Sequence, residues 1–233
     1  MAVFAISDLH LPGGDTKPMD VFGEHWKDHF EKISADWNAR VTDQDVVLLP
    51  GDLSWAMTLE DAKPDLQAVG ALPGRKIILR GNHDFWWSGI GRVRDALPEG
   101  MYAIQNDCVA LDDVVFCGTR GWTLPGEQTT QDDERIYRRE LLRMDMTLSQ
   151  AQRKADGRPI IAMMHYPPLT DACRDTEWVA LLKRYGVRDL VYGHLHGAAL
   201  RSAFRGEHEG VRFHQVSCDG LNFQVRRIDE DPA

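Results

Sequence analysis

Aspartate, histidine and asparagine side chains recur in this sequence at the points where short apolar runs end. They are Asp8, His10, Asp52, Asn82, His83, His165, His194 and His196. Ligands of open α/β sheets bind just beyond the carboxyl ends of the strands, so we expect these side chains to lie close together. Any one of them alone would be an ordinary polar loop residue. Gathering five of the nine histidines beside carboxylates is costly without a cation, and the pattern therefore predicts a metal site.

The number and type of these side chains indicate which metals they suit. Asp8 and His10, like His194 and His196, are two residues apart and face the same way on an extended chain. Four histidines without His83, two aspartates and one asparagine exceed the ligands of one tetrahedral zinc, but divide between two ions. Imidazole combined with carboxylate favours Mn, Fe, Zn, Co or Ni over Ca or Mg. We expect two divalent transition-metal ions.

The apolar runs that precede these residues predict buried strands, since they are short and close on turn-forming residues. The expected strands are residues 3–6, 45–49, 77–79, 160–164 and 190–192. Helical spacing of apolar side chains predicts helices at residues 19–41, 58–69, 86–96 and 131–154. Hairpin-like breaks predict an antiparallel section at residues 102–104, 109–111 and 114–117, and the alternating tail 211–228 predicts the last strands. This order favours an α/β fold with two packed sheets flanked by helices.

Length and charge narrow the class of protein further. A chain of 233 residues suits one large domain. The formal net charge of −9 argues against a stable nucleic-acid partner, and an anionic substrate would need locally supplied positive charge. No apolar run approaches the roughly 20 residues of a membrane span, and the start does not read as a signal peptide, so we expect a cytoplasmic protein. The four cysteines lie far apart and predict reduced thiols.

Five ordered motifs resemble those of the calcineurin-like metallophosphoesterases and span residues 8–196. They are Asp8-x-His10, Gly51-Asp52, Gly81-Asn82-His83-Asp84, His165 and Gly193-His194-x-His196. The resemblance implies one domain over residues 1–233, folded as a four-layer α/β/β/α sandwich with a dimetal centre at the strand ends. By the same resemblance Asp8, His10 and His196 would hold the first metal, Asp52 would bridge both, and Asn82, His165 and His194 would hold the second.

The resemblance implies a metal-dependent phosphohydrolase that cleaves a phosphomonoester or phosphodiester of a small molecule. A hydroxide bridging two ions would attack phosphorus while the ions hold the phosphoryl oxygens. His83 would then be the catalytic residue, placed to protonate the leaving oxygen or to steady the phosphate. Arg120 and Tyr166 are candidate substrate contacts, and residues 119–157 are the expected substrate-side insertion.

The sequence departs from the family pattern at one position. Many relatives carry an acidic residue three positions after the bridging aspartate, where it orients the motif histidine, but Trp55 stands here. Asp84 is a poorly aimed substitute because it is adjacent to His83. One alternative function is hydrolysis of a pyrophosphate in a nucleotide-linked precursor, although such relatives usually have arginine in place of His83. Another is a non-catalytic scaffold, which the complete ligand set disfavours.

Several residues outside the motifs have two interpretations. Trp55, Phe85, Trp86 and Trp87 could stack on a substrate, but burial beneath the following helix is the commoner outcome, and we expect it here. Arg135, Arg138 and Arg139 could reach a phosphate, although a solvated helix face balanced by nearby acidic residues is expected instead.

Overall fold

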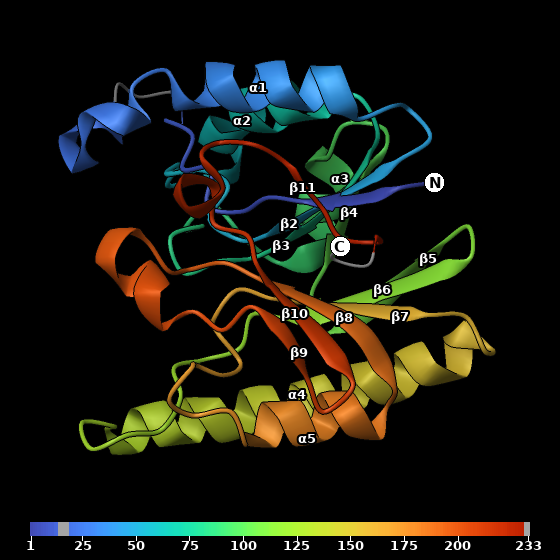
Figure 1. Ribbon diagram of the computed structural model, residues 1–233. Helices are drawn as coiled ribbons and strands as arrows, with labels where there is room; N and C mark the ends of the chain where they lie inside the picture. The colour runs from blue at the N-terminus through green and yellow to red at the C-terminus, as the bar shows by residue number, and fades with distance from the viewer. Residues whose placement is uncertain (14–18, 231–233) are drawn as a thin grey trace.

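The computed structural model describes residues 1–13 and 19–230. Two sheets face one another, and helices cover the outer face of each, which gives the four-layer α/β/β/α order expected from the sequence (Figure 1). The first sheet has the order β11-β1-β2-β3-β4 and the second the order β5-β6-β7-β8-β10-β9.

Each sheet is parallel at its centre and antiparallel at an edge. The first contains β1 (Val3–Ala5), β2 (Val46–Pro50), β3 (Arg75–Leu79) and β4 (Met101–Ile104), all parallel, with β11 (Arg226–Arg227) antiparallel to β1. The second contains β6 (Val114–Thr119), β7 (Ile160–Met164), β8 (Val187–Tyr192) and β10 (Val211–Gln215), all parallel, with β5 (Asp107–Leu111) and β9 (Gly206–His208) antiparallel at its edges. The carboxyl ends of the parallel strands in each sheet therefore lie at one edge, where the functional residues follow.

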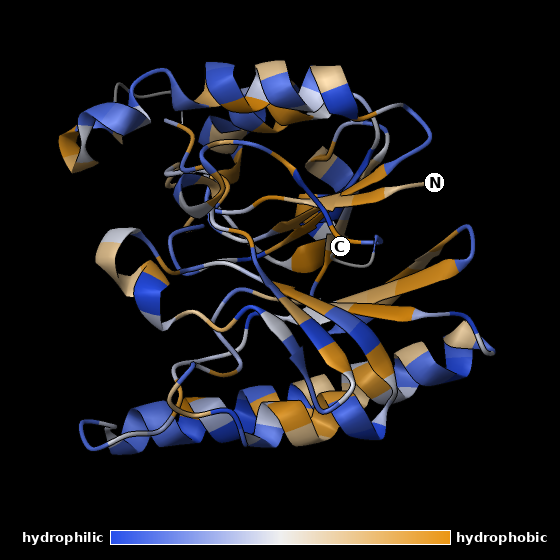
Figure 2. Cartoon of the chain, in the orientation of Figure 1, coloured by the Kyte–Doolittle hydropathy of each residue, from blue (hydrophilic) through white to orange (hydrophobic). Residues whose placement is uncertain are grey.

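Apolar side chains fill three layers of core. In β2, Val46 and Leu48 point between the sheets, whereas Val47 and Leu49 point toward the helices. This alternation follows from the two-residue period of a strand, and burial on both faces explains why the run is apolar throughout. Figure 2 shows apolar residues on the strands and hydrophilic residues on the outward helix faces.

The helices are α1 (His29–Arg40), α2 (Leu59–Gly70), α3 (Ile90–Ala96), α4 (Gln131–Ala155) and α5 (Glu177–Arg184). Thr58 caps α2 by accepting a hydrogen bond from the backbone N–H of Asp61, at 3.3 Å. Thr130 and Asp133 form a reciprocal capping box at the start of α4. α4 packs on β5 and β6 through an apolar face that includes Tyr137 and Met144. Whether residues 119–157 face the substrate stays a prediction.

Three expectations about the elements were wrong. Residues 19–41 form two 3₁₀ turns, η1 (Met19–Phe22) and η2 (Glu24–Trp26), followed by α1, because Gly23 (φ 133°) and Asp28 (φ 53°) leave the helical region. Residues 86–89 are not helical, since the Trp86 and Trp87 side chains are buried in the core beneath that segment. β4 joins the first sheet in parallel with β3 instead of forming a meander with β5.

Two further 3₁₀ turns, η3 (Gly197–Ser202) and η4 (Cys218–Leu221), flank the strand ends at which the polar residues gather. Within residues 1–13 and 19–230, none of the helices has the length and apolar character that crossing a membrane requires.

Candidate metal centre

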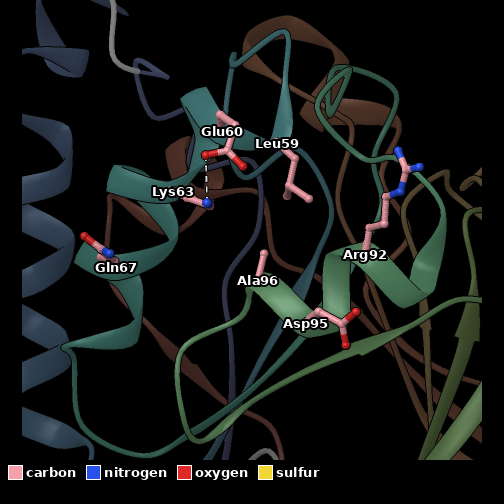
Figure 3. A pocket seen from close by; sticks show the side chains of 7 residues that line it. All are labelled: Leu59, Glu60, Lys63, Gln67, Arg92, Asp95 and Ala96. Carbon is pink, nitrogen blue, oxygen red and sulfur yellow. Dashed lines mark hydrogen bonds and ion pairs between the residues drawn. The ribbon is translucent and has the colours of Figure 1, made fainter.

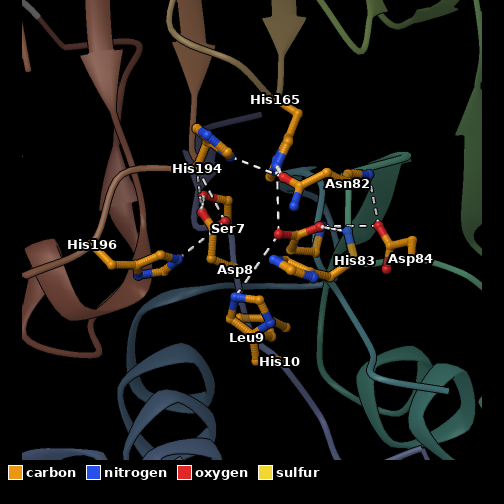
Figure 4. A network of polar contacts seen from close by, with 12 residues as sticks. Ser7, Asp8, Leu9, His10, Asn82, His83, Asp84, His165, His194 and His196 are labelled. Carbon is orange, nitrogen blue, oxygen red and sulfur yellow. Dashed lines mark hydrogen bonds and ion pairs between the residues drawn. The ribbon is translucent and has the colours of Figure 1, made fainter. Parts of the chain in front are cut away.

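The predicted polar residues follow five strands and meet between the two sheets. Asp8 and His10 follow β1, Asp52 follows β2 and Asn82 follows β3, whereas His165 follows β7, and His194 and His196 follow β8. Figure 4 labels all of them except Asp52, and the labelled side chains converge on one region. The structure therefore brings all seven predicted ligands together, from both sheets.

Asp8 is the residue around which two groups of ligand atoms gather. One group combines Asp8 with His10 and His196, and the other combines Asp8 with Asp52 and His165; the ligand atoms of each group lie within 4.8 Å of one another. His196 Nε2 is 3.5 Å from Asp8 Oδ1. Asp8 is fully buried, and a carboxylate in that position needs positive charge nearby.

Asp52 and Asn82 extend this cluster. The Asp52 carboxylate oxygen Oδ2 lies 3.4 Å from His165 Nε2 and 3.9 Å from His10 Nε2, between the two groups. Asn82 Oδ1 lies 2.6 Å from His165 Nε2 and 2.9 Å from His194 Nδ1. Nitrogen and oxygen atoms bound to one ion at about 2.1 Å are roughly 3 to 3.5 Å apart. The Asp52–His165 separation of 3.4 Å lies in that range, and the other three lie within about half an ångström of it.

Unpartnered buried nitrogen atoms supply a second test of the fit. His10 Nδ1 and His196 Nε2 are buried and have no hydrogen-bond partner among the described residues. A buried polar atom without a partner is costly, and a cation would remove that cost. The donor set of imidazole, carboxylate and amide groups suits a divalent transition metal.

In two of the predicted histidine ligands, His165 and His196, the ring nitrogen Nδ1 contacts an oxygen acceptor, which leaves Nε2 for a metal. His165 Nδ1 lies 3.0 Å from the carbonyl oxygen of Pro50, which fixes the tautomer that leaves Nε2 free for a metal. His196 Nδ1 lies 2.9 Å from Asp219 Oδ1, and the other oxygen of Asp219 accepts the N–H of Gly197 at 2.9 Å. Asp219 is not among the residues predicted from the sequence. It also follows a strand end, that of β10, so the strand-exit pattern could have included it.

Burial and charge set the protonation of the cluster. Burial lowers the pKa of His10 to about 3 and the pKa of both His165 and His194 to about 4, so these imidazoles are neutral and able to bind a metal. Burial alone would also lower the pKa of His196, but the hydrogen bond to Asp219 and the nearby charge of Asp8 raise it to about 10. Burial and the charges of Asp84 and Asp8 raise the pKa of Asp52. These carboxylates repel one another when no cation is bound.

The backbone at the cluster is bent into conformations that most residues avoid. Asp8 (φ 58°), His10 (φ 46°), Asp52 (φ 52°) and His194 (φ 71°) all lie in the left-handed region. These bends turn consecutive side chains toward the centre. Gly81 is required for close approach, because a Cβ at that position would overlap the Asp52 carboxylate.

Asp84 holds two motif loops together. Its buried carboxylate accepts the backbone N–H groups of Gly81, Asp52, Leu53 and Ser54 at 2.7–3.2 Å, and it accepts the Trp86 indole N–H at 2.9 Å. With these five donors, its oxygens are directed at the loops and not at the His83 ring. The expectation that Asp84 is poorly aimed to orient His83 agrees with this geometry.

Trp55, which stands where many relatives have an acidic residue, contacts the rings of His10 and His83. Its ring stacks on His10 with centroids 4.7 Å apart, and its centroid is 4.6 Å from that of His83. The burial expected for the four motif aromatic residues holds for Trp86 and Trp87. It is wrong for Phe85, which is exposed, and for Trp55, which is half-buried against both histidines.

A pocket of about 310 Å³ opens beside the cluster, and its lining includes His10, Asp52, His83, His194 and His196. Its other wall is largely aromatic and apolar and consists of Met19, Phe22, His25, Trp26 and Trp55. A second hollow, between α2 and α3, is lined by surface residues such as Glu60 and Lys63 and contains none of the predicted site residues (Figure 3).

The two candidate substrate contacts lie on the other side of the cluster. The Tyr166 ring is 4.3 Å from the His194 ring, centroid to centroid. The Arg120 carbonyl accepts the backbone N–H groups of His165 and Tyr166, both at 3.1 Å, while its guanidinium group lies over the Trp122 ring. Neither residue lines the 310 Å³ pocket, and substrate contact stays a prediction for both.

Two mixed sheets between helical layers, with a His/Asp cluster at the strand ends, define a metallophosphoesterase. The chain belongs to the calcineurin-like phosphoesterase family, whose sequence pattern matches residues 1–198. Membership implies metal-dependent hydrolysis of a phosphoester. No curated protein sequence matches the chain.

Two solved structures resemble the whole chain. Phosphopantetheinyl hydrolase from Mycobacterium tuberculosis is 15% identical, with a TM-score of 0.56 over 99% of this chain and 96% of that one. A protein of unknown function from Aquifex aeolicus is 14% identical, with a TM-score of 0.51 over 97% of this chain and 95% of that one. At these identities the similarity establishes the fold.

Proposed function

We propose that this protein is a hydrolase that uses two divalent transition-metal ions to cleave a phosphomonoester or phosphodiester of a small molecule. The observation that carries the proposal is the convergence of ligand atoms from five strand ends, with separations of 2.6–3.9 Å between Asn82, His165, Asp52 and His10. Family membership supports the reaction class.

Asp8, His10 and His196 would hold the first ion, and Asn82, His165 and His194 the second, with Asp52 between them. The position of Asp52 Oδ2 between His10 and His165 supports the bridging role. Its other oxygen, Oδ1, accepts the backbone N–H of His83 at 2.8 Å and is thereby kept out of the shared position. Two bound metal ions would stabilise the negative charge of the phosphoryl oxygens and lower the pKa of a bound water toward neutrality.

His83 is the proposed catalytic residue. Burial lowers its pKa below the ordinary value of 6.5, although the charges of Asp84 and Asp8 act in the opposite direction. At neutral pH its imidazole is neutral, and its N–H can donate a hydrogen bond to the oxygen of the leaving group. Contact with the Trp55 ring, which is tilted against His83 and stacked on His10, supports the His83 side chain at the pocket in place of a carboxylate.

The aromatic wall of the pocket indicates the leaving group. Phe22 is 63% exposed at its rim, whereas Trp26 is buried behind it. An apolar surface of this kind beside a charged centre favours a leaving group with an aromatic or aliphatic part. We infer that hydrolysis is faster when the esterified alcohol carries such a part.

The experiment compares bis-p-nitrophenyl phosphate, p-nitrophenyl phosphate and a nucleotide sugar as substrates of the full chain with added Mn²⁺. We expect hydrolysis of at least one p-nitrophenyl ester and loss of activity in Asp52→Asn. Asp95→Asn, a surface substitution on α3, is the matched control and keeps full activity.

Cleavage of the nucleotide sugar alone would replace our proposal with the pyrophosphate hydrolase. No hydrolysis of any substrate, together with no bound metal by elemental analysis, would establish a scaffold. Because elemental analysis does not depend on turnover, it separates a wrong substrate from a missing metal centre.

A further inference from the structure

A further pocket, of about 200 Å³, lies on the side of the molecule covered by α4. It is bounded by α4, the end of β3, the turn between β4 and β5, and the residue that follows β6. Its lining is Leu79, Arg80, Gln105, Asn106, Arg120, Arg139, Glu140 and Arg143. Four guanidinium groups therefore face a single carboxylate, which leaves three positive charges in a chain of net charge −9. Such a concentration of one sign at a small hollow attracts anions.

Glu140 fixes two of these arginines. Its buried Oε1 accepts hydrogen bonds from Arg143 Nη1 at 2.6 Å and from Arg139 Nη2 at 3.3 Å. Arg135 and Arg138 of the same helix are paired with Asp132 and Glu134 on its exposed face, as expected from the sequence. The helix arginines therefore divide into a solvated set and a set directed at the pocket.

Arg80 and Arg120 lack a compensating carboxylate. Neither forms an ion pair with any residue in the described ranges 1–13 and 19–230, and the half-buried Arg80 has a buried Nε without a hydrogen-bond partner. The Arg120 backbone is fixed by the hydrogen bonds that its carbonyl accepts from His165 and Tyr166. Its guanidinium carbon lies 4.9 Å from the centre of the Trp122 ring. Burial lowers the pKa of Arg120; the charges of Tyr166 and Glu140 oppose this shift, and those of Arg80 and Arg139 add to it. These groups repel one another until an anion lies between them.

The pocket adjoins the metal centre without containing any of its ligands. Arg80 precedes Asn82 by two residues, and the carbonyl of Arg120 accepts the N–H of His165 at 3.1 Å. Both connections lead to the proposed second ion. The aromatic pocket beside His10 opens on another part of the cluster and shares no lining residue with this one.

We propose that Arg80, Arg120, Arg139 and Arg143 form a binding site for a phosphate group, separate from the phosphate that is hydrolysed. Arginine forks match the oxygens of a phosphate with two parallel hydrogen bonds each. Drug-sized ligands occupy about 300 to 1,000 Å³, so this smaller pocket suits a compact oxyanion. The bound group is either a second phosphate of the substrate or a free phosphate ion.

Titration calorimetry of the metal-loaded full chain with inorganic phosphate tests the site. We expect a binding event in addition to the metal centre, and this event weakens as ionic strength rises. Arg139→Gln, at the half-exposed rim, should weaken it by about tenfold or more, because a hydrogen bond to a charged group contributes about 1.5 kcal/mol or more. Arg120→Gln, on the opposite wall, should weaken the same event.

Arg135→Gln is the matched control, since it removes one arginine from the exposed face of the same helix. It should leave phosphate binding unchanged, and thermal melting checks that every variant is folded. Phosphate binding that Arg139→Gln and Arg120→Gln leave as strong as in the unaltered protein would overturn the proposal.

Kinetics then separate the two sources of the phosphate, and this arm rests on the proposed function. If the site binds part of the substrate, Arg139→Gln raises KM for a nucleoside bisphosphate and leaves KM for p-nitrophenyl phosphate unchanged. If it binds a free ion, both KM values stay the same while phosphate binding weakens. Calorimetry needs no turnover, so a failed phosphoesterase assay leaves the binding result intact.

Discussion

Replacing Asp219 with asparagine should weaken binding of one metal ion. The Asp219 carboxylate is 2.9 Å from His196 Nδ1, and its side chain is only 4% exposed, so solvent screens this interaction little. Asparagine keeps the size and an acceptor oxygen but removes the charge that makes the imidazole a stronger ligand. Loss of such an outer partner typically weakens metal binding by about 10- to 100-fold, which is roughly 1.4 to 2.8 kcal/mol.

The pH dependence gives this prediction a second readout. His196 has a pKa of about 10 in the metal-free protein, so below pH 10 it carries a proton that the metal must displace. Its affinity for the metal should therefore fall by up to about tenfold for each unit of decreasing pH. In Asp219→Asn the pKa of His196 is lower, and the proton competes less. The affinity difference between the two proteins should therefore be full only above pH 10, where His196 is unprotonated in both, and it should shrink as the pH falls below 10.

Competition with a chromophoric chelator, with Zn²⁺ or Co²⁺ as the metal, measures both effects. Asp175→Asn is the matched control, because Asp175 contacts His208 Nε2 at 3.2 Å in a pair whose carboxylate is on the surface. It should leave metal binding unchanged. Equal affinities of the unaltered protein and Asp219→Asn at pH 10.5, where the proton no longer competes, would refute the role assigned to Asp219.

Three other outcomes follow from the same geometry. Metal at a free concentration of 100 times Kd stabilises the folded protein by about 2.7 kcal/mol. Removing it with a chelator should therefore lower Tm by roughly 5 to 10 °C for a chain of this length, as measured by calorimetry. An unchanged Tm would contradict the proposed metal centre. Asp84→Asn should lower the free energy of unfolding in urea by about 3 kcal/mol or more, because five donors lose a buried carboxylate, whereas surface Asp95→Asn should change it little. Trp55→Ala should reduce kcat about three- to tenfold through loss of the ring contact with His83, and Trp55→Phe should restore most of it; equal rates in all three proteins would count against Trp55 as a positioning residue.

Much of the site could be predicted because it follows from local rules. Strands such as β2 and β7 are buried on both faces and therefore read as unbroken apolar runs. Each ends on a polar residue, Asp52 or His165, whose position along the chain needs no tertiary information. The order of the motifs then indicated the family, and the family indicated the sandwich.

Other features depend on contacts between distant segments. β4 reads like the hairpin strands that follow it, but pairing with β3 places it in the first sheet. Apolar spacing extends through residues 19–41, yet Gly23 and Asp28 bend the chain there. Asp219 lies 23 residues after His196 in the sequence. It reaches that histidine only because η4 packs against η3, the turn that follows β8.

The left-handed residues link the fold to the metals. Non-glycine residues in this conformation cost about 1 kcal/mol or more each, although aspartate tolerates it better than most. Four ligands, Asp8, His10, Asp52 and His194, adopt it at once. Backbone hydrogen bonds across β1 and β2, such as Asp8 N–H to the Gly51 carbonyl at 3.0 Å and His10 N–H to the Asp52 carbonyl at 3.0 Å, oppose relaxation of these bends.

The chain thus holds buried carboxylates and imidazoles in a strained arrangement before any ion binds. Burial raises the pKa of Asp52, and nearby Asp84 and Asp8 add to that rise, so these groups disfavour the ionised form of Asp52. A cation reverses this preference because it favours the ionised carboxylate. The repulsion between the buried carboxylates is therefore relieved by a cation, which is the reason to expect that metal binding stabilises the two facing sheets as well as creating the catalytic centre.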